Sequence, residues 1–90
     1  MRRWTVKAII MPKHGVNDPQ GEAIKGGLQS LEFSGIEDVR AGKQIAIMLE
    51  ARSREEAVAA VERMCEQLLA NPVIETYSIS ADEARQESAT

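Results

Sequence analysis

Apolar and polar residues alternate along several short segments of the chain, a pattern typical of β-strands. Residues 4–11 are rich in β-branched and aromatic types and end at Pro12, which predicts the first strand. Further strands are predicted over 36–39, 44–51 and 73–80. Alternate positions of the first strand form one apolar face, which consists of Trp4, Val6, Ala8 and Ile10.

Two other segments have helical periodicity. The first begins at Asp18-Pro19, because Asp accepts hydrogen bonds from free helix amides and Pro is favoured at the first position. Its apolar stripe runs to Phe33. The second begins at Ser53, with Glu56 completing a capping box, and ends at Asn71-Pro72. Its apolar stripe consists of Ala57, Val58, Val61, Met64, Cys65, Leu68 and Leu69.

The predicted element order is β-α-β-β-α-β, with Ala41-Gly42 at the tip of a hairpin. With right-handed crossovers, this order places two helices on one face of an antiparallel sheet, as in ferredoxin-like α+β domains. We therefore predict a two-layer α+β fold. Residues 1–80 are expected to form a single domain, and the polar residues 81–90 a frayed or disordered tail.

The sheet face opposite the predicted helices has nothing in this chain to cover it. It is nevertheless partly apolar, because the second face of the strand over 44–51 is not polar throughout. A second copy of the chain laid against this face would bury it, so we predict at least a homodimer, either a dimer or a tetramer. The candidate residues of this oligomer face are Ile9, Met11, Ala46 and Met48.

Composition excludes several classes of function. Eleven basic residues against fourteen acidic ones give a net charge of -3, so the chain lacks the basic surplus of a nucleic-acid-binding protein. The apolar runs are too short to span a membrane, and we expect a soluble cytoplasmic protein. The single cysteine, Cys65, excludes an internal disulfide and a thiolate metal cluster.

The search for catalytic groups finds none. His14 is the only histidine, and we interpret it as an exposed loop residue because no nucleophile accompanies it. Cys65 falls in an apolar stripe and is interpreted as a core residue. We expect no catalytic, cofactor or metal site in this chain. Two alternatives stay open, namely a ferredoxin-like regulatory dimer that binds a small molecule and an enzyme whose site is shared between protomers.

Three segments resemble one known family. They are Asp18-Pro19-Gln20-Gly21, Val39-Arg40-Ala41-Gly42-Lys43, and the long stretch from Cys65 through Leu-Leu-Ala-Asn-Pro-Val-Ile-Glu to Tyr77. The chain is identified from them as a member of the PurS family, the small subunit of phosphoribosylformylglycinamidine synthase. The resemblance extends from about Val6 to Tyr77.

The resemblance implies an accessory role in de novo purine biosynthesis. In that family the small subunit forms dimers and joins a glutaminase subunit and a large ATP-dependent synthetase subunit. Together they act as a carbon–nitrogen ligase that converts formylglycinamide ribonucleotide, glutamine and ATP to formylglycinamidine ribonucleotide, glutamate, ADP and phosphate. ATP and Mg²⁺ belong to the synthetase. The small subunit is implied to bridge its partners and to assist ammonia transfer.

The family motifs also supply candidate positions for partner contact, or for the turns that shape the contact surface. Arg40 and Lys43 are the preferred pair, because no local structural role requires their charge. The full set of candidates is Asp18, Pro19, Gln20, Gly21, Arg40, Gly42, Lys43, Asn71 and Pro72.

Overall fold

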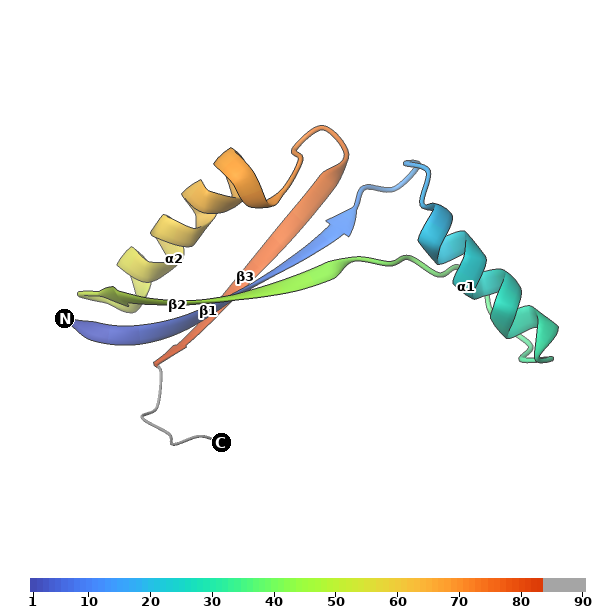
Figure 1. The fold of residues 1–90 in the computed structure, drawn as a ribbon, viewed down its shortest axis with the longest axis horizontal. Coiled ribbons are helices and arrows are strands. Elements are labelled where there is room, and N and C mark those ends of the chain that lie inside the picture. The colour runs from blue at the N-terminus through green and yellow to red at the C-terminus, as the bar shows by residue number, and fades with distance from the viewer. Residues whose placement is uncertain (84–90) are drawn as a thin grey trace.

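A three-stranded antiparallel sheet forms the centre of the molecule (Figure 1). The computed structural model describes residues 1–83. The strands are β1 (Arg2–Pro12), β2 (Lys43–Ala51) and β3 (Glu75–Glu83), in the order β2-β1-β3. The predicted α+β class with an antiparallel sheet is confirmed.

One face of this sheet is covered by α2 (Arg54–Met64), which continues as the π-helical turn η1 (Cys65–Leu69) (Figure 1). The core lies between this helix and the sheet. The alternation predicted for the first strand is confirmed, since Trp4, Val6, Ala8 and Ile10 are all buried. From α2 and η1, Ala57, Val61 and Cys65 are fully buried against them.

The start of α2 has the predicted capping box. The Ser53 hydroxyl accepts a hydrogen bond from the Glu56 amide at 3.1 Å, and the Glu56 carboxylate accepts one from the Arg52 amide at 2.8 Å. These bonds satisfy amides that have no partner within the helix. The sequence therefore located this helix start correctly.

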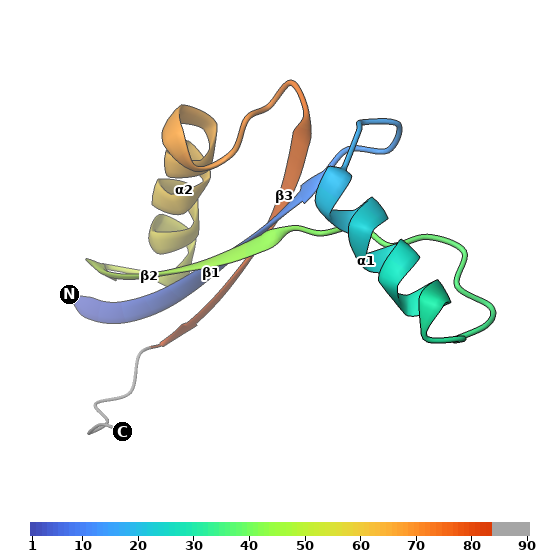
Figure 2. The same ribbon diagram turned by 45° about the vertical axis from the view of Figure 1, so that its right-hand side comes forward.

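The other helix, α1 (Pro19–Ser30), does not cover the sheet. It projects beyond the end of β1, and both views show it separated from the sheet (Figures 1 and 2). It makes no substantial contact with a strand or with α2 in the described part of the chain. It packs instead along the extended segment that follows it, where the Lys25 ammonium donates to the Glu37 carbonyl at 3.0 Å. The prediction that both helices lie on one face is wrong for α1.

The strand predicted over 36–39 is absent, because these residues are extended but pair with no strand within residues 1–83. Ala41-Gly42 is consequently not a hairpin tip and leads directly into β2. A strand requires a neighbour as well as β-favouring residues. Projection of α1 carries 36–39 away from β2, so one edge of β2 has no partner in the described chain.

The end of β3 and the direction of the side chains in η1 differ from the prediction. β3 extends to Glu83 and pairs with β1 of the same chain, with Trp4 opposite Glu83, so the expected tail begins too early. Residues 84–90 of that tail lie outside the described residues. In η1 the wider π-turn changes the direction of the side chains, and Leu68 is 82% exposed although its spacing predicted burial.

Candidate partner-binding site

Residues of all three family motifs meet at one end of the sheet, where β1 ends and β2 and β3 begin. An open groove of about 440 Å³ lies there. Its walls come from the start of α1 (Pro19, Gln20), the segment before β2 (Gly42, Lys43) and the start of β3 (Glu75). Residues that are more than 50 positions apart in the sequence thus line one surface.

Asp18 connects two of these walls. Its carboxylate accepts a hydrogen bond from the Gly21 amide at 3.0 Å, as the N-cap of α1, and another from the Ala41 amide at 2.9 Å. These two bonds, the one from Ala41 first, hold the pKa of Asp18 below its ordinary value, and Arg40 adds a smaller effect. The predicted cap is confirmed, and the same side chain has a second, long-range function.

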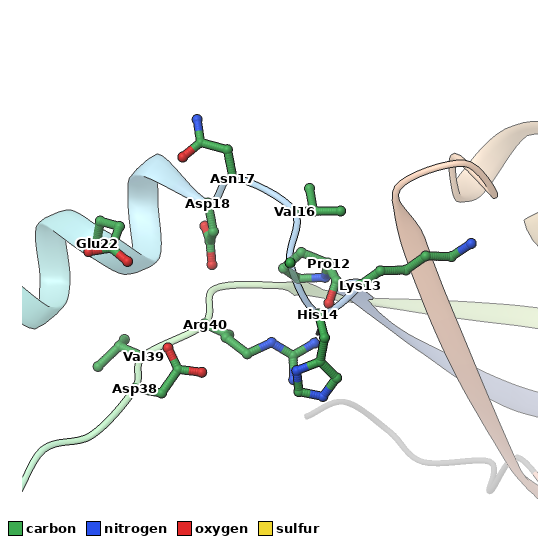
Figure 3. A pocket seen from close by; sticks show the side chains of 11 residues that line it. Pro12, Lys13, His14, Val16, Asn17, Asp18, Glu22, Asp38, Val39 and Arg40 are labelled. Atoms are coloured by element: carbon green, nitrogen blue, oxygen red, sulfur yellow. Dashed lines mark hydrogen bonds between the residues drawn. The ribbon is translucent and has the colours of Figure 1, made fainter.

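Arg40 lies in an adjoining pocket of about 140 Å³, which Figure 3 shows from close by. Its guanidinium donates a hydrogen bond to the Pro12 carbonyl, where β1 ends. The expectation that Arg40 has no local structural role is therefore wrong. Lys43, in contrast, is exposed and makes no side-chain hydrogen bond within residues 1–83, so its charge is available to a partner.

Gly21 and Gly42 are required by close backbone approach. A β-carbon at Gly21 would overlap the Val39 carbonyl oxygen, and one at Gly42 would overlap the Ile10 carbonyl oxygen. Only glycine permits these approaches. Both motif glycines thus pack the segment before β2 against its neighbours.

Asn71 and Pro72 do not line the groove but lie in the turn just before its third wall, which Ile74 and Glu75 form. The Asn71 side chain accepts a hydrogen bond from the Val73 amide at 3.1 Å, and the Glu75 carboxylate accepts one from the Asn71 amide at 2.7 Å. The Ile74 carbonyl accepts a bond from the Lys13 amide at 2.8 Å, which ties this turn to the end of β1. These bonds hold the turn beside the groove.

The proposed oligomer face lies on the side of the sheet opposite α2. Ile9 is 43% exposed and Met48 55% exposed, Ala46 is exposed, and Met11 is half-buried. Polar residues are interleaved with them, since Lys7 pairs with Ala46 and Ser78 pairs with Ile9. The four residues do share one face, and that face is more polar than the sequence pattern indicated.

The groups considered for catalysis are distributed as follows. His14 is exposed in the loop after β1, and Cys65 is fully buried, where burial raises the pKa of its thiol. Residues 1–83 hold no group of three or more His, Cys, Asp or Glu side chains that could bind a metal ion. No helix in the same range is long and apolar enough to cross a membrane.

The sequence analysis missed a second set of surface residues. On α1 and just after it, Ile24, Leu31 and Phe33 are 43%, 70% and 58% exposed. Their helical spacing identified an apolar stripe but not that it would be uncovered. Near the turn before β3, Leu68 and Val73 are also largely exposed.

The family model that matches this chain is described as PurS, phosphoribosylformylglycinamidine (FGAM) synthase, and it covers residues 5–83. The PurS subunit of Archaeoglobus fulgidus is 52% identical over 67 residues, which are 74% of this chain and 84% of that protein. The crystallised PurS of Thermus thermophilus is 37% identical with a TM-score of 0.82, over 92% of this chain and 99% of that one. A chain of PurLQS from Thermotoga maritima is 32% identical with a TM-score of 0.81, over 90% and 99%.

Fold and site together define a small α+β domain with an open groove at one end of its sheet and with uncovered apolar surfaces. The sequence and structure matches cover most of the chain, and they show its family. The chain belongs to the PurS family of phosphoribosylformylglycinamidine synthase subunits.

Proposed function

We propose that this chain is the accessory subunit that bridges the glutaminase and the ATP-dependent synthetase of the synthase complex and assists ammonia transfer between them. Its fold is that of a chain in the Thermotoga maritima PurLQS structure. The observation that carries the proposal is the convergence of residues from all three family motifs on one groove. ATP and Mg²⁺ are assigned to the synthetase, and the cytoplasmic location expected from the sequence stays a prediction. Family membership favours this function over a regulatory small-molecule-binding dimer.

Self-association is the second part of the proposal. We call residues 18–39, which comprise α1 and the extended segment after it, the arm. The arm exposes the apolar stripe of α1, and a β-carbon at Gly26 or Gly27 would meet nothing within 4 Å. Two adjacent helix glycines cost about 1 kcal/mol each relative to Ala. No contact within this chain requires these glycines, whereas the close approach of a second chain would require them.

The arm of one copy fits the incomplete sheet of another. Ile45, Ile47 and Leu49 of β2 lie on the same face as α2 and are only half-buried. A partner's α1 beside α2 would cover them, while the partner's residues 36–39 would pair with the free edge of β2. Each copy then completes the sheet of the other, which gives the β-α-β-β-α-β arrangement predicted from the sequence. Because the exchange of arms is reciprocal and two-fold symmetric, it produces a dimer and leaves no arm unpaired.

Reconstitution with a glutaminase and a synthetase of the same complex tests the bridging function. Lys43→Glu reverses a charge that has no structural partner in the described chain, so it should preserve folding and dimerisation. We expect it to lower glutamine-dependent activity while activity with added ammonia is retained. Gln29→Glu, on the exposed surface of α1 away from the groove, is the matched control. Unchanged glutamine-dependent activity of the Lys43 variant would remove the groove from the bridging surface.

A further inference from the structure

We infer that Asp18 and Arg40 form a lock that holds the arm away from its own sheet and so directs it to a second copy. This inference rests on the proposed exchange of arms. The relevant segment is 40–42, which we call the hinge, because it connects the arm to β2. The hinge leads from the arm into the sheet without a hairpin (Figure 2).

Folding the arm back over its own sheet requires the hinge to reverse direction. Residues 36–39 would then run beside β2 and meet it in a hairpin at 40–42, the arrangement that the sequence pattern predicts. In this closed form α1 would contact its own sheet, and in the exchanged dimer it would make the same kind of contact with the sheet of the second copy. When closed and exchanged forms share their contacts, the conformation of the hinge decides between them.

Two hydrogen bonds hold the hinge in this conformation, one to each of two neighbouring segments. On one side, the Asp18 carboxylate accepts a hydrogen bond from the Ala41 amide at 2.9 Å. On the other, the Arg40 guanidinium donates to the Pro12 carbonyl at the end of β1. Figure 3 shows the two side chains reaching across the space between the loop after β1 and the hinge. Because each bond involves a charged group, each is stronger than a bond between neutral groups.

Gly42 contributes to the same geometry. Its α-carbon lies so close to the Ile10 carbonyl that a side chain there would overlap it. The hinge is therefore pressed against the last residues of β1, and reversal would separate them. Two adjacent residues, Arg40 and Ala41, are thus fixed to opposite neighbours immediately before this contact.

Asp18→Asn separates the lock from the helix cap. Asn is as good an N-cap as Asp, and its single amide oxygen can still accept the Gly21 amide. The NH₂ group of the Asn side chain is only a donor, however, and cannot accept a hydrogen bond from the Ala41 amide. Arg40→Gln removes the second bond without touching the cap, so it tests the lock even if the first variant disturbs α1. Lys43→Gln removes a neighbouring charge that makes no such bond and serves as the control.

Double electron–electron resonance measures the position of the arm directly. Spin labels at Ser30→Cys and Glu50→Cys, in a Cys65→Ala background, report the distance from the far end of α1 to the far end of β2. Dilution of the labelled chain with unlabelled protein restricts the measurement to distances within one chain. We expect a long distance in the unsubstituted background and in Lys43→Gln. In Asp18→Asn and Arg40→Gln, the short-distance population should rise roughly tenfold, the shift expected from loss of one such bond.

The lock is overturned if both variants keep the long distance with unchanged helix content, or if the unsubstituted arm is already folded back. Sedimentation velocity on the same samples tests the exchange separately. A monomer with an extended arm would refute the exchange and retain the lock. A dimer whose arm stays extended in both variants would refute the lock and retain the exchange.

Discussion

Ile24 provides a quantitative test of the proposed dimer. It lies in the middle of α1, and 43% of its surface is exposed in the single chain. Full burial of an Ile side chain stabilises by about 2.5 kcal/mol, so covering the exposed share contributes roughly 1 kcal/mol. A two-fold dimer contains the contact twice, for about 2 kcal/mol. Since each 1.4 kcal/mol is a factor of ten, Ile24→Ala should raise the dimer dissociation constant about 30-fold.

Sedimentation equilibrium over a dilution series measures this constant. Ala has higher helix propensity than Ile, so the substitution does not weaken α1 itself. Gln29→Ala is the matched control, because it truncates an exposed polar residue of the same helix. The reasoning is refuted if Ile24→Ala changes the constant no more than Gln29→Ala does. If Met48→Ser dissociates the oligomer instead, the interface is the open sheet face.

Three further predictions concern folding and the ionisable groups. Gly42→Ala should destabilise the chain by about 1–3 kcal/mol in urea unfolding, because the new methyl group overlaps the Ile10 carbonyl, whereas Gln29→Ala, at an exposed polar position of α1, should not destabilise it. Cys65 should react with a thiol reagent only after unfolding, since it is fully buried and burial raises its pKa; rapid labelling of the native protein would contradict this packing. The pKa of Asp18 is lower in the folded chain, so its contribution to stability is present above the ordinary carboxyl pKa near 4 and is lost as pH falls through the lower folded value. Asp18→Asn should therefore flatten the acid side of the stability profile, and an unchanged profile would show that the two amide bonds do not stabilise the charged form.

Elements specified by local chemistry could be predicted from the sequence. The alternation beginning at Trp4 located the central strand, and the caps at Asp18 and Ser53 located both helix starts. Each of these signals acts over a few residues. They therefore do not depend on how the arm is placed.

The position of the arm could not be predicted in this way. The residues around Ile36 favour a strand, but strand formation depends on a neighbour that this single chain does not bring to them. Leu68 has the spacing of a buried residue, and only the π-turn exposes it. For the site, five of the motif residues line the groove, namely Asp18, Pro19, Gln20, Gly42 and Lys43. The bonds from Arg40 to Pro12 and from Ala41 to Asp18 join segments more than 20 residues apart. No local pattern reports such pairs.

The central place of β1 in the sheet has a consequence for synthesis. β1 leaves the ribosome before β2 and β3, yet one of its two neighbours, β3, ends only at Glu83. Until those last residues emerge, one edge of β1 has no partner and the strand can pair with other nascent chains. Termination after α2 would leave that edge of β1 permanently open, so products that lack β3 should be prone to aggregation and degradation.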